Sequence, residues 1–341
     1  MLQADNLELN DLRKWINGLY PSQLVELNFA ASDAGCRKYY RAILQNQRTL
    51  MIMQTPPEED ILSPYIQVQQ LFQGVRVPEI YHFQLERGWM ALEDFGDNTF
   101  IRLLKSNVDP EWHKALLLKA VFTLISIQTT SQPDKLPPYS EEELSREMDL
   151  FVEWCIPKYY LKTMTDTQWK TWQAAKSLLL SSILNQPCVY VHRDYIIRNL
   201  MLLEDQTVGV IDFQDARWGS ICYDLLSLTR DAFITWDEAF TLDLVIRYWE
   251  NAKRVGLPVN SAFDTFYQQY EWIGVQRHLK VAGIFARLKF RDQKDAYLNE
   301  IPRILQYLKN TTRRYQALLP LYQLLLELTG PDVTVEKGFT F

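Results

Sequence analysis

Glycine is scarce in this sequence, which has only 12 glycines among 341 residues, about half of the usual share of roughly 7%. No G-x-G-x-x-G or G-x-x-x-x-G-K-[ST] motif occurs, which excludes the two common glycine-rich cradles for nucleotide phosphates. The four cysteines form no C-x-x-C pair, so neither a disulfide framework nor a zinc site is indicated. We therefore expect a protein of a reducing compartment.

The sequence also lacks a long apolar run and an excess of basic residues. The longest apolar stretch, residues 115–127, is interrupted by Lys119 and is too short to cross a bilayer. The net charge is −6, from 36 Lys and Arg against 42 Asp and Glu, which argues against a general nucleic-acid binder. We expect a cytoplasmic protein that binds neither nucleic acid nor a membrane, and no obligate protein partner is evident.

Apolar residues make up 47% of the sequence, enough for one bilobal fold or two compact units. Short β-prone segments at 24–30, 38–45, 49–53, 79–85 and 89–93 indicate an antiparallel sheet. Later segments at 112–128, 141–160, 166–184 and 304–328 have helical patterns. The sequence predicts an α+β, bilobal chain with a small antiparallel β N-lobe (residues 1–96) and a larger, mostly helical C-lobe (residues 97–341).

One short motif indicates chemistry. His192, Arg193 and Asp194 are followed by Asn199 in the spacing H-R-D-x-x-x-x-N, and Asp212-Phe213 ends a later apolar strand. This pattern is typical of phosphoryl-transfer enzymes, in which the first aspartate accepts a proton from the attacking hydroxyl. Asn199 and Asp212 would then supply oxygen ligands to Mg²⁺. A purely structural alternative is that both aspartates cap turns after short strands.

These motifs and the order of the segments resemble the aminoglycoside phosphotransferase family, a small-molecule branch of the protein-kinase-like fold. The strings that carry the resemblance include LEDFGD (92–97), HRDYIIRNLM (192–201), IDFQDARWG (211–219) and YDLLSLTRD (223–231). The resemblance covers essentially the whole chain and implies ATP and Mg²⁺ as cofactors. It makes Asp194 the catalytic base and Asn199 and Asp212 the metal ligands, while Asp224 is expected to anchor the catalytic loop by hydrogen bonds.

The nucleotide side of the site departs from this family pattern. The resemblance implies that the backbone of a hinge pairs with adenine; its residues are Glu93, Asp94 and Phe95. Kinases of this fold grip the α- and β-phosphates with a strand lysine, yet no lysine occurs between Lys38 and Lys105. We expect one or more of Arg37, Lys38 and Arg41 to bind the nucleotide in its place. Alternatively, these cations form a solvated strand edge.

A second departure is Ile196, where relatives usually place a cationic residue or a histidine. Arg198 is a candidate catalytic residue that supplies positive charge toward the γ-phosphate, because a guanidinium is permanently charged and matches phosphate with two hydrogen bonds. The alternative is a salt bridge from Arg198 to the helical lobe.

The substrate class is indicated by residues 272–291, which contain five Lys or Arg residues and one His but no Asp or Glu. A basic helix at the acceptor site favours a neutral or anionic substrate over a cation, although the same residues could form the polar face of an amphipathic helix. Within the family, the strings resemble the bacterial anomeric sugar kinases. This implies an ATP-dependent kinase for the C1 hydroxyl of the amino sugars N-acetylmuramate and N-acetylglucosamine, in peptidoglycan recycling. The alternatives are a kinase of another small alcohol, such as an aminoglycoside or amino alcohol, and a pseudokinase that serves as a binding module.

Overall fold

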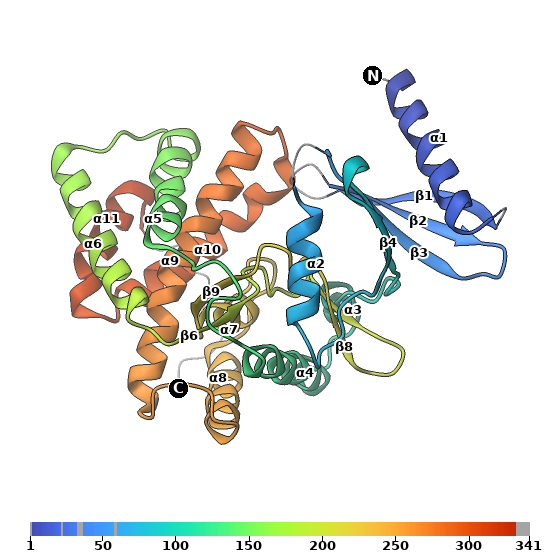
Figure 1. Ribbon diagram of the computed structural model, residues 1–341. Helices are drawn as coiled ribbons and strands as arrows, with labels where there is room; N and C mark the ends of the chain where they lie inside the picture. Colours follow the sequence, from blue (N-terminus) through green and yellow to red (C-terminus); the bar gives the residue numbers. More distant parts are fainter. Residues whose placement is uncertain (1, 22, 33–36, 58–59, 332–341) are drawn as a thin grey trace. The chain divides into compact units, whose positions relative to one another are not determined.

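The computed structural model describes residues 2–21, 23–32, 37–57 and 60–331 (Figure 1). Its contacts divide the chain into two compact units. The first unit comprises Met1–Leu103 and Leu200–Asp215, and the second comprises Leu104–Asn199 and Ala216–Phe341. No helix within the described residues is long and apolar enough to span a membrane.

The first unit is built on the five-stranded antiparallel sheet that the sequence predicts (Figure 1). Its strands are β1 (Leu24–Ser32), β2 (Lys38–Leu44), β3 (Thr49–Gln54), β4 (Ile80–Gln84) and β5 (Trp89–Glu93), in the order β1-β2-β3-β5-β4. Aromatic and β-branched side chains at alternate positions favour these strands. Tyr40 pairs with Ile52, and Ile52 pairs with Ala91. These three residues are buried on the same side of the sheet.

Helix α1 (Leu2–Leu19) covers this side of the sheet (Figure 1). Leu12 and Ile16 lie one turn apart on α1, and both are completely buried against Ala42, Leu50 and other sheet residues. Helix α2 (Leu62–Leu71) follows β3 along the chain.

A hairpin from much later in the sequence belongs to the first unit. Its strands are β7 (Leu200–Leu202) and β8 (Val208–Val210). The N–H of Leu202 donates to the carbonyl of Asn98 at 2.9 Å, and the N–H of Val210 donates to the carbonyl of Arg76 at 2.8 Å. Gly209 lies against Phe95 so closely that a Cβ atom would be 2.7 Å from the ring. The hairpin therefore holds the start of the segment 211–215 within this unit.

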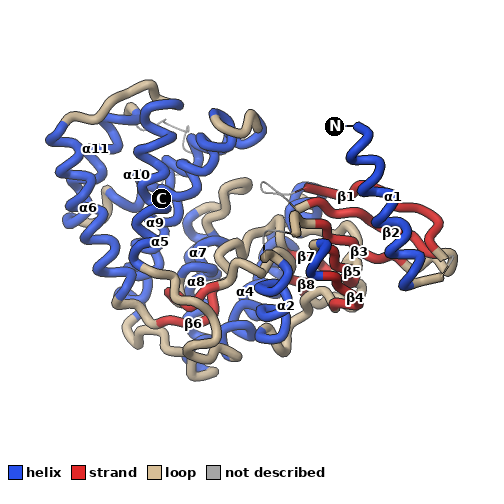
Figure 2. The backbone as a smooth tube through the Cα atoms, turned by 45° about the horizontal axis from the view of Figure 1, so that its top comes forward, coloured by secondary structure: helices blue, strands red, loops and turns tan. Residues whose placement is uncertain are grey.

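The second unit is mostly helical (Figure 2). Its helices are α4 (Pro110–Thr129), α5 (Glu141–Leu150), the π-helix η2 (Phe151–Tyr159), α6 (Asp166–Leu184), α7 (Tyr223–Thr229), α8 (Glu238–Arg254), α9 (Phe263–Phe290), α10 (Ile301–Thr312) and α11 (Leu319–Thr329), with short 3₁₀ helices at Asp295–Glu300 and Gln316–Leu318. Helix α3 (Phe100–Ser106) spans the division of the sequence between the two units, and a 3₁₀ turn at Leu85–Arg87 belongs to the first unit. The short strands β6 (Cys188–Val191) and β9 (Arg217–Ser220) pair antiparallel. Helix α6 has the predicted bounds because Thr165 and Gln168 form a capping box at its N-terminus.

One sequence-based expectation for the helical unit is wrong, and the basic segment of α9 is more buried than expected. A single helix was expected over 304–328, but the chain turns between α10 and α11, and Pro320 lies in the first turn of α11, where a missing N–H is tolerated. The basic segment 272–291 is buried in its first half, whereas Arg287 and Lys289 are half-buried and Arg291 is exposed. Arg277, His278 and Lys280 are only 3%, 2% and 7% exposed, because α9 runs through the core and contacts α5, η2, α6, α7 and α10.

Candidate active site

The H-R-D segment follows β6 in the second unit and is held by a buried carboxylate. Arg193 has a φ of 73°, a left-handed conformation that is uncommon for a non-glycine residue. The carboxylate of Asp224, which is completely buried, accepts the N–H of His192 at 2.6 Å and the N–H of Arg193 at 3.0 Å. These bonds hold the strained turn that precedes Asp194. The predicted anchoring role of Asp224 is confirmed.

A second buried carboxylate holds the other end of the loop. Asp231 accepts the N–H of Ile197 at 3.3 Å and the N–H of Phe233 at 2.7 Å. Between these anchors the side-chain amide of Asn199 donates to the carbonyl of Asp194 at 3.0 Å. Two predicted site residues, Asp194 and Asn199, are thus brought together within the second unit.

Both anchoring carboxylates lie in an environment that opposes their ionisation. Burial raises the pKa of Asp224 to about 6, although His192 and the N–H groups of residues 192 and 193 act in the opposite direction. Burial likewise raises the pKa of Asp231 to about 6, opposed by the N–H of Phe233 and by Arg277. Both carboxylates are mostly ionised at neutral pH, the form that accepts these hydrogen bonds.

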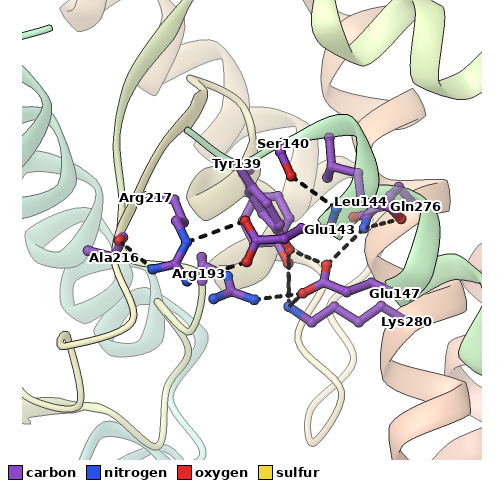
Figure 3. Close-up of polar contacts among 11 residues, drawn as sticks. Tyr139, Ser140, Glu143, Leu144, Glu147, Arg193, Ala216, Arg217, Gln276 and Lys280 are labelled. Atoms are coloured by element: carbon purple, nitrogen blue, oxygen red, sulfur yellow. Dashed lines mark hydrogen bonds and ion pairs between the residues drawn. The ribbon is translucent and has the colours of Figure 1, made fainter. Parts of the chain in front are cut away.

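The side chain of Arg193 enters a buried cluster of charges (Figure 3). Glu147 of α5 pairs with Arg193 at 2.6 Å and with Lys280 of α9 at 3.0 Å. The ammonium of Lys280 also donates to the hydroxyls of Tyr139 and Tyr223, each at 3.2 Å. One carboxylate therefore pairs with two inward-facing cations, one of which adjoins Asp194 in sequence, and the three groups keep a net positive charge.

The ionisation of Glu147 follows from this geometry. Burial opposes the charged form, but Lys280 and Arg193 outweigh burial and lower the pKa of Glu147 to about 2. Tyr139 also donates a hydrogen bond to Glu147. The pKa of Lys280 is raised despite its burial, by Tyr223 and Glu147 and to a smaller extent by Asp194. Glu147 and Lys280 are thus both charged at neutral pH.

The first unit holds the other half of the predicted site. Asp212 follows β8 with a φ of 65°, and its carboxylate is 3.1 Å from the guanidinium of Arg37. The next residue, Phe213, packs on Tyr65 and Phe72, with ring centroids 4.5 Å and 5.8 Å away. This packing fixes the backbone on which Asp212 is displayed. The structure therefore brings together two more predicted residues, Arg37 and Asp212.

The other two candidate cations differ in their surroundings. Arg41 forms ion pairs with Asp94 at 2.6 Å and with Asp97 at 2.9 Å, and it also donates to the carbonyl of Gly96 at 3.1 Å. Lys38 lies in β2 opposite Gln54. Arg41 is thus committed to the segment after β5, while Arg37 faces the carboxylate of a predicted metal ligand.

The predicted hinge follows the end of β5. The N–H of Glu93 already donates to the carbonyl of Glu79 at 2.8 Å, and its carboxylate pairs with Arg76 at 2.6 Å. The side chain of Asp94 is only 2% exposed and pairs with Arg41. The side chain of Phe95 lies under the β7–β8 hairpin.

Arg198 is exposed and lies beside aromatic rings of the second unit. Its guanidinium carbon is 4.7 Å from the ring centroid of Phe233 and 5.8 Å from that of Tyr297. The expected alternative of a salt bridge to the helical lobe is not observed for Arg198 among the described residues.

The sequence interpretation did not identify Glu147, Asp231 or Lys280 as parts of the site. Each contacts the catalytic loop or its cluster across a separation of tens of residues. Their residue types are common in surface helices, so a single sequence contains no signal that singles them out.

The donor set fits a hard cation held mostly by phosphates. Within the described residues no group of three or more His, Cys, Asp or Glu side chains could hold a metal by itself. Mg²⁺ commonly uses only one or two protein oxygens, with substrate phosphates and waters completing its shell. The amide nitrogen of Asn199 donates to Asp194, and amide and carboxylate oxygens are the ligand types that Mg²⁺ accepts. Asn199 and Asp212 are thus suitable ligands of this kind.

Comparisons with known proteins identify the family. The profile of the phosphotransferase enzyme family, APH, matches residues 26–257. An N-acetylmuramate/N-acetylglucosamine kinase of Neisseria meningitidis is 49% identical over 330 residues, covering 97% of this chain and 98% of the relative.

Solved structures of low sequence identity share the fold. Choline kinase LicA from Streptococcus pneumoniae superposes with a TM-score of 0.63 at 14% identity, covering 88% of this chain and 98% of the other. The ADP-bound aminoglycoside phosphotransferase APH(2'')-Ib gives a TM-score of 0.55 at 13% identity, covering 88% and 98%. The family resemblance and the kinase-like α+β fold expected from the sequence are confirmed: the chain belongs to the phosphotransferase enzyme family.

Proposed function

We propose that this protein is an ATP-dependent kinase that phosphorylates the anomeric C1 hydroxyl of N-acetylmuramate and N-acetylglucosamine, in the recycling of cell-wall sugars. The observation that carries the proposal is the 49% identity, over nearly the whole chain, to a kinase named for these two sugars. The anchored loop that displays Asp194 beside Asn199 supports it, because a pure binding module does not require this arrangement.

In the proposed reaction Asp194 accepts the proton of the C1 hydroxyl. The C1 oxygen forms a bond to the γ-phosphorus while the bond from that phosphorus to ADP breaks, in line with direct phosphoryl transfer. Asn199 and Asp212 would hold Mg²⁺, which supplies positive charge for the phosphate oxygens. The hinge at residues 93–95 would bind adenine.

Arg37 is the cation that we propose in place of the missing strand lysine. Its guanidinium lies 3.1 Å from Asp212 and its side chain is only 13% exposed, so it is already fixed beside a proposed metal ligand. Arg41 is less suited to this role because Asp94, Asp97 and Gly96 occupy its donors.

The central experiment incubates the protein with Mg·ATP and each sugar and follows phosphorus NMR for a sugar-1-phosphate signal. We expect product with both sugars, and the Asp194→Asn variant should lose turnover while its affinity for Mg·ATP, measured by calorimetry, changes less than about threefold. No product with any sugar, together with no stabilisation by nucleotide, would contradict a kinase and would favour a binding module.

Nucleotide affinity tests the role of Arg37 separately. Arg37→Ala should weaken Mg·ATP binding by about 10- to 100-fold, the value of a charge-assisted hydrogen bond of roughly 1.5–3 kcal/mol. Arg48→Ala is the matched control, since Arg48 is an exposed arginine of the same unit that lies 4.5 Å over the ring of Tyr81. Equal affinities of the two variants would reject this role for Arg37.

A further inference from the structure

Arg198 is a cation held in place on the catalytic loop. It lies over an aromatic platform that consists of Phe233, Phe285 and Tyr297, whose ring centroids are 5.1–6.3 Å apart. A planar guanidinium over such rings gains cation–π and stacking energy. This contact leaves the edge of the guanidinium, which carries its N–H donors, available for a ligand.

The platform and the loop are joined by one carboxylate. Asp231 accepts the N–H of Ile197, which precedes Arg198, and the N–H of Phe233, which belongs to the platform. On the other side of Arg198, the amide of Asn199 donates to the carbonyl of Asp194. Arg198 is therefore fixed at a short distance along the loop from the proposed catalytic base.

Several other cations of the second unit already have carboxylate partners, although the buried Arg277 is not among them. The pairs are Arg193 and Lys280 with Glu147, Arg217 with Glu143, Arg230 and Arg314 with Glu271, and Arg303 with Glu300. A cavity of about 540 Å³ is lined by three of these paired arginines, at positions 230, 303 and 314. In the described part of the chain Arg198 has no such ion pair and is exposed.

We infer that Arg198 binds the lactyl carboxylate of N-acetylmuramate, and so determines how strongly the enzyme prefers this sugar over N-acetylglucosamine. The inference rests on the proposed function. It gives Arg198 a role different from the γ-phosphate contact that the sequence predicts. A guanidinium matches a carboxylate with two parallel N–H···O bonds. The lactyl group is attached to C3 of the sugar, so its carboxylate lies within one ring's width of the C1 hydroxyl.

The two roles of Arg198 make different predictions for the two sugars, because N-acetylglucosamine has no lactyl carboxylate. Arg198→Gln should lower the ratio of kcat/KM for N-acetylmuramate to kcat/KM for N-acetylglucosamine by about 10- to 100-fold, the range for a charge-assisted hydrogen bond. Equal losses with both sugars would place Arg198 at the γ-phosphoryl group and would overturn the inference. The matched control is Arg247→Gln, an exposed arginine of α8 that pairs with Asp243, for which the ratio should stay constant.

A substrate change tests the same contact without relying on a variant that folds. For the wild-type enzyme, the methyl ester of N-acetylmuramate should lose kcat/KM by about as much as Arg198→Gln loses with the free acid. In Arg198→Gln the ester and the acid should react about equally, because the losses from removing either partner of one pair are not additive. Additive losses, or an ester that reacts as well as the acid in the wild type, would refute the contact.

The platform provides a further check. Tyr297→Leu should reduce the sugar preference partly, whereas Tyr297→Phe, which keeps the ring, should preserve it. If the wild type phosphorylates neither sugar, the proposed function fails. If it phosphorylates both and the ratio does not respond to Arg198, only this inference fails.

Discussion

Glu147 should be one of the most important single residues for the stability of the helical unit. It lies between Lys280 and Arg193 with its side chain only 9% exposed. Its pKa is lowered from 4.5 to about 2 because these cations outweigh the effect of burial. A lowering of this size corresponds to roughly 3 kcal/mol of stability at neutral pH. This agrees with the roughly 3–5 kcal/mol that is lost when one partner of a buried pair is removed.

The assay is thermal unfolding of Glu147→Gln, which keeps the shape of the side chain and removes its charge. A loss of about 3 kcal/mol lowers the Tm by roughly 6–12 °C for a unit of this size. The matched control is Glu143→Gln, one turn earlier on α5. Glu143 pairs with Arg217 at 3.3 Å, and both side chains are about one-fifth exposed. Removing the charge of Glu143 should therefore lower the free energy of unfolding by no more than about 1 kcal/mol.

The pH dependence provides a second observable with a definite sign. A carboxylate whose pKa is lowered by folding stabilises the protein above its unfolded pKa, and this stabilisation is lost as the pH falls toward the folded value. The difference in Tm between wild type and Glu147→Gln should therefore shrink between about pH 4.5 and about pH 2. Equal Tm values for the Glu147 and Glu143 variants at neutral pH, or a difference that persists at acid pH, would refute this interpretation.

Three other substitutions, with Gly274→Ala as a control, test the packing and the anchors. Gly283→Ala should lower the free energy of unfolding, measured in urea, by about 3 kcal/mol, because the new Cβ would be 2.4 Å from the backbone of Leu150. Gly274→Ala on the same helix should lower it by about 1 kcal/mol or less, because the new Cβ meets only the flexible end of a leucine side chain. Arg41→Ala should lower the free energy of unfolding by about 3 kcal/mol in the same assay, because the buried carboxylate of Asp94 loses its arginine partner. Asp224→Asn should lower kcat by about 10- to 100-fold, because an amide accepts through only one atom and cannot satisfy both loop N–H groups; its Mg·ATP affinity should stay within about threefold of the wild-type value, as measured by calorimetry.

Local patterns in the sequence were sufficient to predict the five-stranded sheet and helix α6. In both cases the signals lie within the element itself: β-prone residues in the strands and a helical pattern over 166–184. The break between α10 and α11 was missed because the apolar period continues through both helices. The bonds of the β7–β8 hairpin to Asn98 and Arg76 join segments about a hundred residues apart or more, and no local pattern encodes such a pairing.

The same distinction applies to the candidate site. The spacing of Asp194 and Asn199 predicts a loop, and in the structure the side-chain amide of Asn199 closes this loop by a hydrogen bond to the carbonyl of Asp194. The partners of that loop were not predictable, because Asp231 and Glu147 act through contacts that the tertiary fold creates. The basic character of residues 272–291 indicates a helix at the acceptor site or a polar helix face, and neither interpretation predicts the burial of Arg277 and Lys280. Composition does not reveal that Lys280 has Glu147 as an internal partner.

The difference between lysine and arginine explains how the proposed site could work without a strand lysine. A lysine ammonium is a compact point charge, whereas a guanidinium presents five donors in one plane. Arg37 can keep one of its nitrogens on Asp212 and direct others toward a phosphate, so one side chain can contact both the proposed metal ligand and the nucleotide. The conformation of Asp212, with a φ of 65°, is fixed by the packing of Phe213 on α2. In the proposed function, an arginine beside a fixed carboxylate would therefore compensate for the two features that the sequence lacks, a glycine-rich cradle and the usual lysine.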